Sequence, residues 1–392
     1  MTPHKAYLLP RSSSSRREDA YTGQAKQFMI ILSLETSCDE TGAAVVEKKD
    51  NEQFVRVLSN VTATSSSLHA KTGGIIPEFA AREQIKAIIP VIVRALLNSE
   101  GINNEAIKQL NNSKQFERAN EILKKSIDAI AVTSGPGLIG SLLVGVETAK
   151  TLSFAFDKPI IPVHHLLAHL FANFILNTEY SILNTGKMFP FIGLIVSGGH
   201  TDLLLFESAS KFKWLGGTRD DAAGEALDKV GRILGLSYPA GPEIERRANN
   251  QQPTAKFHSP LINTEDFDFS FSGLKTEISR FIVKKHLTER LINEVCHALQ
   301  EAIFAVLIKK TIRAAKLYKI NNILLGGGVS ANQTLRQQFE LTAKSQLPTA
   351  KISAPAKTYA TDNAAMIGAY ALLNYKPVDW HKITALPDLY FD

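Results

Sequence analysis

Hydrophobic and polar residues alternate in blocks, and one pattern of blocks occurs twice along the chain. Residues 29–34 are almost entirely hydrophobic, residues 35–42 form a polar segment, and a second hydrophobic run begins at residue 43. The same order returns at residues 191–206, about 160 residues further on. Short hydrophobic runs around a polar turn are typical of two paired strands. The repetition indicates an internal duplication, so we predict two α/β domains that each begin with a β-hairpin.

Segments with helical periodicity alternate with further short hydrophobic runs. We predict additional strands at residues 54–60, 127–133, 160–163 and 322–325. We predict helices at residues 78–97, 139–156, 166–176, 288–318, 331–345 and 362–374. This alternation places the chain in the α/β class. We predict a first domain at 29–160, with a polar helical or flexible surface insertion at 99–126, and a second domain at 161–392.

The composition fits a globular protein and excludes several other classes. Of the 392 residues, 44% are hydrophobic and 21% are charged, which argues against a largely disordered or fibrous chain. No run approaches about 18 uninterrupted hydrophobic residues, so we predict no transmembrane helix. Two cysteines, Cys38 and Cys296, are too few for a disulfide scaffold or a zinc site built on several thiolates. The net charge of +6 permits a nucleic-acid partner without requiring one.

The first 28 residues differ from the rest of the chain. They contain a run of four serines and carry five basic residues against two acidic ones. They lack the hydrophobic stretch of a secretory signal. We interpret residues 1–28 as a disordered tail or as the result of a start codon assigned too early, with Met29 as the expected start. An organellar transit peptide is the alternative, although Glu18 and Asp19 count against it.

Two histidines have the spacing of metal ligands. His165 and His169 are four residues apart, so they share one face of the predicted helix. Leu166 stands where the HExxH motif of metalloproteases has its catalytic glutamate. Asp362 is a candidate third ligand, in a segment where Thr361 is the predicted N-cap of a late helix. Imidazole and carboxylate ligands suit iron, zinc and manganese, and a pair of partly buried histidines without metal is the alternative.

Polar turns at the ends of predicted strands supply further candidate groups. Glu35, Asp39 and Glu40 lie in the turn of the first hairpin. Carboxylates at the end of a sheet can orient a nucleophile, hold a metal through water or act as a base, although an ordinary polar turn explains them as well. The turn 197–201 contains two glycines, whose backbone N–H groups could bind an anion, and a simple hairpin turn is again the alternative.

Two other segments have features of ligand sites. Asp221, Glu225 and Asp228 recur at a helical spacing within residues 220–228, so we predict that they share one helix face. Residues 326–332 form a glycine-rich turn between a strand and a helix, which is typical of nucleotide sites. The turn matches neither the dinucleotide-binding fingerprint nor the P-loop.

Ten short motifs occur in order within residues 29–375. They read SLETSCDETG, HAKTGGIIPEFAARE, SGPGLIGSLLVG, HHLLAHL, VSGGHTDL, DDAAGEALDK, YPAGP, FSFSGLKT, GGGVSAN and TDNAAMIG. Each motif alone is weak, but the ten in this order closely resemble the TsaD/Kae/OSGEP family of tRNA N6-adenosine threonylcarbamoyltransferases.

This resemblance implies a fold, a reaction and partners. The expected fold is the actin-like/Hsp70-like/sugar-kinase (ASKHA) fold with two related α/β domains. The expected reaction transfers the threonylcarbamoyl group from threonylcarbamoyl-adenylate to N6 of adenosine 37 in tRNAs that read ANN codons, giving t6A and AMP. Besides tRNA and the adenylate, the implied partners are a paralogous TsaB-like subunit and a TsaE-like P-loop ATPase, or instead a kinase-containing assembly. The implied location is cytoplasmic, with no membrane partner.

The resemblance also assigns roles to individual residues. One divalent metal per subunit, Fe²⁺ or alternatively Zn²⁺, would be held by His165, His169 and Asp362. The implied substrate-binding residues are Ile195, Val196, Ser197, Gly198, Gly199, Asp228, Gly241 and Asn332. Glu40 matches a turn carboxylate that the family needs for activity, so Glu40 or Asp39 is the expected catalytic base. The sequence departs from the family pattern at Gln84, where many members carry histidine, but this difference removes none of the proposed ligands.

Other functions fit the sequence less well. In a kinase or carbamoyltransferase of the same fold, the His165/His169 pair would have no explanation. A glycoprotein endopeptidase would need a motif such as HExxH, which is absent from the sequence. The non-catalytic paralogous scaffold subunit lacks the metal triad, whereas all three of its residues are present here.

Overall fold

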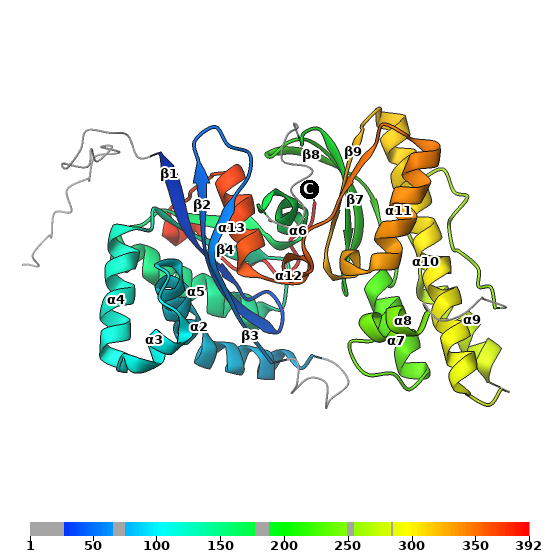
Figure 1. The fold of residues 1–392 in the computed structure, drawn as a ribbon, viewed down its shortest axis with the longest axis horizontal. Helices are drawn as coiled ribbons and strands as arrows, with labels where there is room; N and C mark the ends of the chain where they lie inside the picture. Colours follow the sequence, from blue (N-terminus) through cyan, green and yellow to red (C-terminus); the bar gives the residue numbers. More distant parts are fainter. Residues whose placement is uncertain (1–26, 66–74, 177–187, 249–254, 284, 392) are drawn as a thin grey trace, which may run out of the picture.

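A computed structural model describes residues 27–65, 75–176, 188–248, 255–283 and 285–391. Two mixed sheets with helices packed around them lie side by side (Figure 1). This arrangement confirms the α/β class and the two related domains. Apart from its last two residues, the predicted tail 1–28 lies outside the described residues.

The first sheet contains five strands in the order β3-β2-β1-β4-β5. The strands are β1 (Phe28–Glu35), β2 (Glu40–Lys49), β3 (Arg56–Thr64), β4 (Ala129–Gly135) and β5 (Ile160–His164). The first three are antiparallel neighbours, whereas β1, β4 and β5 run parallel. The predicted first hairpin is therefore β1–β2, and its polar turn lies at one end of the sheet.

The second sheet repeats this topology in the order β10-β9-β6-β7-β8. Its strands are β6 (Phe191–Val196), β7 (Thr201–Ser208), β8 (Lys211–Gly217), β9 (Asn322–Gly326) and β10 (Lys351–Ser353). Again three consecutive strands pair antiparallel, and β6, β9 and β10 run parallel. Matching strand order and direction in both sheets agree with the duplication that the sequence pattern indicates.

The helices between β3 and β6 cover the first sheet and form the insertion, and the last of them also contacts β6 and β9 of the second sheet. They are α2 (Pro77–Ser99), α3 (Asn104–Gln109), α4 (Asn112–Lys125), α5 (Ile139–Phe156) and α6 (His165–Phe171). Segment 99–126 is thus largely helical, and the side chains of Asn103 and Asn111 cap its two helices. The helix predicted at 166–176 is shorter, because α6 gives way to a 3₁₀ turn at Ala172–Phe174.

Later helices complete the second domain and then return to the first. They are α7 (Ala223–Ile233), α8 (Gly241–Ala248), α9 (Ser272–Ile282), α10 (Glu289–Tyr318), α11 (Gln333–Gln346), α12 (Lys357–Ala360) and α13 (Ala364–Leu373). Helix α13 packs on β1 and β2, and Val378 forms a bridge with Ile160. The end of the chain therefore packs against the first sheet, and the division at residue 160 stays a prediction.

Two local predictions were wrong. Helix α13 begins later than predicted, because the side chain of Asn363, not Thr361, accepts the hydrogen bond from the N–H of Met366. Asp221 lies before α7, not on it, and its carboxylate binds the ammonium of Lys229 at 2.6 Å. Asp221 therefore does not share a helix face with Glu225 and Asp228.

Two helices have the length and hydropathy of a membrane span. A third of α5 is buried, and 61% of the most hydrophobic 18-residue stretch of α10 is buried. Helix α10 lies in the core of the second domain, where it packs against α8 and α11. Helix α5 packs against β4 and α2. Both therefore act in this fold as helices of a globular domain.

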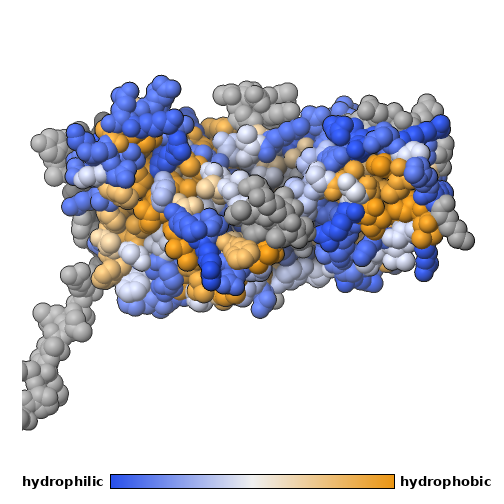
Figure 2. Space-filling view, turned by 90° about the horizontal axis from the view of Figure 1, so that it is seen from below, coloured by the Kyte–Doolittle hydropathy of each residue, from blue (hydrophilic) through white to orange (hydrophobic). Residues whose placement is uncertain are grey.

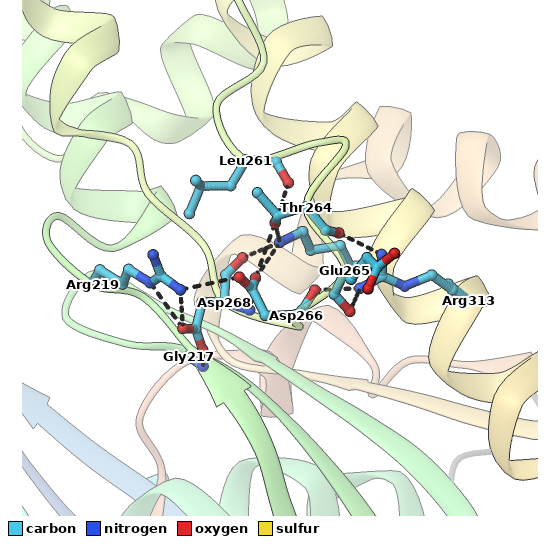
Figure 3. A network of polar contacts seen from close by, with 9 residues as sticks. Gly217, Arg219, Leu261, Thr264, Glu265, Asp266, Asp268 and Arg313 are labelled. Atoms are coloured by element: carbon cyan, nitrogen blue, oxygen red, sulfur yellow. Dashed lines mark hydrogen bonds and ion pairs between the residues drawn. The ribbon is translucent and has the colours of Figure 1, made fainter.

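A buried lysine ties the loop before α9 to α10. The Lys310 side chain is fully buried, and its ammonium donates to Thr264 Oγ1 at 2.9 Å, to Asp266 Oδ1 at 3.1 Å and to the carbonyl of Asp268. Around it, Arg313 binds the carbonyls of residues 264–266, and Arg219 binds both aspartates (Figure 3). The loop is therefore held by charge-assisted hydrogen bonds.

We predict that Lys310→Met lowers the free energy of unfolding by about 2–3 kcal/mol, because several acceptors lose a charged donor. Lys309→Met is the matched control, since the neighbouring ammonium is exposed and binds only Asn263 in the described structure. It should change stability by less than about 0.5 kcal/mol. Urea denaturation measures both values, and equal effects would show that the buried network is not a major source of stability.

Candidate functional site

His165, His169 and Asp362 converge between the two domains. Strand β5 leads directly into α6, whose helical spacing places the two imidazoles on one face. Asp362 reaches them from the connection between α12 and α13. Its Oδ1 lies 3.5 Å from Nε2 of His165 and 3.3 Å from Nε2 of His169. The three candidate ligand atoms all lie within 4.8 Å of one another.

The electrostatics of this cluster favour a positive charge. Burial alone would lower the pKa of His165, but the carboxylates of Glu35 and Asp362 raise it to about 9. Burial would also raise the pKa of Asp362, yet the two histidines keep it well below its usual range. Nδ1 of His169 is buried without a hydrogen-bond partner among the residues that the structure describes, and Nε2 of the same ring is buried beside Asp362. Two imidazoles and an ionised carboxylate that converge in this way fit one divalent cation.

Glu35 holds His165 from the opposite side. The Glu35 carboxylate is 1% exposed, and it accepts hydrogen bonds from Thr133 Oγ1 and the Ser37 N–H, both at 2.6 Å. It also lies 3.1 Å from Nδ1 of His165. A carboxylate on one ring nitrogen orients the imidazole and leaves the other nitrogen for a metal. The sequence pattern predicts Glu35 only as one of the turn carboxylates and does not predict its contact with His165. Its position at the end of a buried strand was the feature that could have indicated a buried role.

The turn with the two candidate bases is pinned by Gln84. Its amide nitrogen donates to the carbonyls of Cys38 at 3.1 Å and Glu40 at 2.8 Å, and the side chain is almost fully buried. Asp39 and Glu40 both line the cavity beside the histidine cluster. Burial, together with the charges of Asp362 and Asp39, raises the pKa of Glu40 to about 10. Glu40 is therefore protonated unless a nearby positive charge stabilises its ionised form.

A cavity of about 680 Å³ joins the two hairpin turns. Its wall includes His165 and Asp362, the turn residues Ser197, Gly198 and Gly199, and Asp228 of α7. A smaller cavity of about 220 Å³ adjoins it, and its wall includes Gly198, Asp228, Gly241 and Asn332. Six of the eight predicted substrate-binding residues thus lie around two neighbouring cavities. The other two, Ile195 and Val196, are fully buried in β6 and line neither cavity.

The glycines at this site leave room for a ligand. A Cβ atom added to Gly198, Gly199 or Gly241 would meet no described atom within 4 Å.

The polar side chains that line the smaller cavity also form hydrogen bonds within the protein. Asp228 accepts a hydrogen bond from the Ala240 N–H at 2.7 Å, and Asn332 caps α11 while donating to Gln300. These bonds hold α7, α8 and α11 around the smaller cavity.

A family model and the sequences of known relatives agree on one family. The family model described as TsaD, tRNA N6-adenosine threonylcarbamoyltransferase, matches residues 56–369. Enzymes of that name from Kosmotoga olearia and Persephonella marina are 41% and 43% identical, over 91% and 89% of this chain and 98% and 90% of their own lengths. The crystal structure of T. kodakarensis HypF is similar with a TM-score of 0.54 at 12% identity. That similarity covers 89% of this chain and 48% of HypF, and it shows the fold alone.

We predict that Glu35→Gln weakens binding of a divalent metal roughly 10- to 100-fold, because the amide loses the charge that orients and polarises His165. A competition titration of Zn²⁺ or Fe²⁺ against a chromophoric chelator measures this affinity. Glu47→Gln is the control, since Glu47 lies on β2 and pairs with Arg56. Unchanged affinity in Glu35→Gln would exclude a role for Glu35 in holding the metal.

Proposed function

The chain belongs to the tRNA N6-adenosine threonylcarbamoyltransferase family, and from this premise we propose how its residues carry the reaction. The protein is a transferase that forms t6A in tRNA. We propose threonylcarbamoyl-adenylate as the donor, adenosine 37 of tRNAs reading ANN codons as the acceptor, and AMP as the leaving group. The observation that carries this proposal is the position of the His/His/Asp cluster, whose His165 and Asp362 line the larger of two adjoining cavities.

We propose that His165, His169 and Asp362 hold Fe²⁺, with Zn²⁺ as the alternative. Two imidazoles and an ionised carboxylate support this proposal, since both ions accept such ligands. When bound, a divalent cation would act as a Lewis acid on the carbamoyl carbonyl or on phosphate oxygens of the donor.

We propose that the nucleotide part of the donor occupies the smaller cavity. Asp228, Gly241 and Asn332 line that cavity, and Gly198 lines both cavities. A donor lying across Ser197–Gly199 would place its reactive carbonyl in the larger cavity, near Asp39 and Glu40. Backbone N–H groups of the glycine turn could then stabilise the negative charge that develops during attack.

The chemistry needs positioning and a base more than a protein nucleophile. A mixed carbamic–phosphoric anhydride is already activated, so no covalent protein intermediate is required. The N6 amine of adenosine is a weak nucleophile, because its lone pair is delocalised into the purine, so its orientation and the removal of its proton matter. We propose Glu40, or alternatively Asp39, as the base. The negative charge of Asp362 helps to raise the pKa of Glu40. A positive charge that neutralises Asp362 would therefore lower this pKa and favour the ionised carboxylate of Glu40, which is the form that accepts a proton.

A single-turnover assay tests these roles. Protein, partner proteins and purified threonylcarbamoyl-adenylate are mixed with unmodified tRNA, and t6A is measured by nucleoside mass spectrometry. We expect Glu40→Ala to reduce the rate about 100-fold or more, because the proton acceptor is lost. Glu83→Ala, an exposed α2 position paired with Lys86, is the control. Undiminished transfer by Glu40→Ala would eliminate Glu40 as the base, and no t6A from the wild-type protein would defeat the proposed donor and site.

The alternative functions gain no support from the site. A non-catalytic scaffold subunit has no need for three converging ligand atoms at a cavity. In a kinase of the same fold, the arrangement of Glu35, His165 and Asp362 would have no purpose.

We propose that the protein acts in the cytoplasm together with a small P-loop ATPase and a paralogous subunit of the same fold. We further propose that the paralogous subunit binds on the exposed face of α2 and α5. Six large hydrophobic side chains are exposed on these two packed helices: Phe79, Ile85, Ile89, Ile139, Leu143 and Phe154. Figure 2 views the molecule from the side on which α2 lies and shows hydrophobic side chains gathered there. A cluster of this kind is typical of a protein–protein interface.

We predict that Ile85→Glu weakens binding of the paralogous subunit at least tenfold, because a charge must be buried without a partner. Isothermal titration calorimetry measures the affinity. Leu341→Glu is the matched control, since Leu341 on α11 is 67% exposed and Ile85 is 64% exposed. Equal affinities for the two variants would place the interface elsewhere.

A further inference from the structure

The last residues of the chain run between the two domains. The Leu386 N–H donates to the carbonyl of Ser134 at 2.7 Å, and the Gly137 N–H donates to the carbonyl of Pro387 at 3.2 Å. The approach at Gly135 is so close that an added Cβ would lie 1.9 Å from the Leu386 oxygen. The backbone of this C-terminal segment, residues 386–391, is therefore fixed to the first domain at the loop that precedes α5.

The far end of the C-terminal segment contacts the second domain. Tyr390 donates its hydroxyl hydrogen to Asp202 Oδ1 at 2.6 Å, and the Trp214 indole N–H donates to the same oxygen at 3.1 Å. Asp202 is 1% exposed on β7. Its cross-strand neighbour Gly217 leaves the space for this contact, since a Cβ there would lie 2.4 Å from Oδ1. Phe391 then stacks on the ring of His164, with centroids 5.2 Å apart.

The second oxygen of Asp202 faces His200. Its Oδ2 lies 3.9 Å from Nδ1 of His200, which is too long for a hydrogen bond but close enough for the carboxylate to act on the dipole of the neutral imidazole. His200 lies at the end of the glycine turn and lines the larger cavity together with His165 and Asp362. Its side chain is one-third exposed, so without an oriented neighbour its imidazole could turn away from the cavity wall.

We propose that Tyr390 is a positioning residue for the transfer reaction: it fixes Asp202, and Asp202 holds the imidazole of His200 at the cavity wall. Trp214 supports the same carboxylate from β8. Tyr390 acts through two residues and touches no reacting atom, whereas His200 is placed to contact substrate. The proposal rests on the transferase function. It adds the C-terminal segment to the parts of the chain that shape the site.

Tyr390→Phe tests this proposal, because it removes one hydroxyl and keeps the aromatic packing. We expect kcat/KM for t6A formation to fall about tenfold in the otherwise wild-type protein, as for loss of a hydrogen bond to a charged group. In a His200→Ala background the same substitution should change kcat/KM less than twofold, because the residue through which it acts is gone. Additive losses in the double variant would overturn the proposal.

Histidine-selective ¹⁵N NMR supplies a readout that does not depend on activity. The His200 signals, assigned by their loss in His200→Ala, should shift in both Tyr390→Phe and Trp214→Phe. Tyr375→Phe is the matched control, since Tyr375 and Tyr390 are 39% and 41% exposed, and it should leave kcat/KM and the His200 signals unchanged. Unshifted His200 signals in Tyr390→Phe would overturn the proposal. If the wild-type protein made no t6A while the signals shifted, the proposed donor and site would fail and the Tyr390–His200 coupling would stand.

Discussion

The contact between the Glu35 carboxylate and the imidazole of His165 connects the fold to the candidate site. Glu35 ends the central strand of the first sheet, and His165 begins the helix that follows the edge strand β5. The carboxylate is fully buried and has two further donors, Thr133 and Ser37, so its position is fixed by the sheet itself. Because the ring of His165 is oriented by this carboxylate, its Nε2 points towards Asp362. The geometry of the cluster therefore depends on how β1, β4 and β5 pair.

Duplication explains why the remaining groups lie close by. Each domain begins with a hairpin, and both hairpin turns line the larger cavity, one with Asp39 and Glu40 and the other with the glycine turn. One turn supplies carboxylates and is pinned by Gln84. The other is open around its glycines and can admit a ligand. Two copies of one supersecondary unit thus provide complementary chemistry on opposite sides of a shared space.

Local patterns in the sequence predicted the features that depend on residues close together in the chain, such as helices, strands and the spacing of side chains on one helix face. Strand and helix periodicity placed α5 at residues 139–156, and the four-residue spacing placed His165 and His169 on one helix face. Capping choices were less predictable, because Thr361 and Asn363 are both suitable caps and only the packed structure selects Asn363. The contacts of Glu35 and Tyr390 could not be derived from patterns. Their partners His165 and Asp202 are 130 and 188 residues away, and such distant pairs are set by the tertiary fold.

The distribution of charge couples the metal ligands to the candidate base. Glu35 and Asp362 raise the pKa of His165, so the cluster without metal retains a proton on that ring. A divalent cation would displace this proton and supply a larger positive charge, because metal ligation requires the neutral imidazole. The same charge would act on Glu40, whose pKa is raised by burial and by Asp362. His165 and Glu40 both interact with the carboxylate of Asp362, so the two groups cannot titrate independently of each other. The protonation state of Glu40 is therefore a property of the whole cluster, and substitutions of Glu35 or Asp362 alter the turn as well as the metal site.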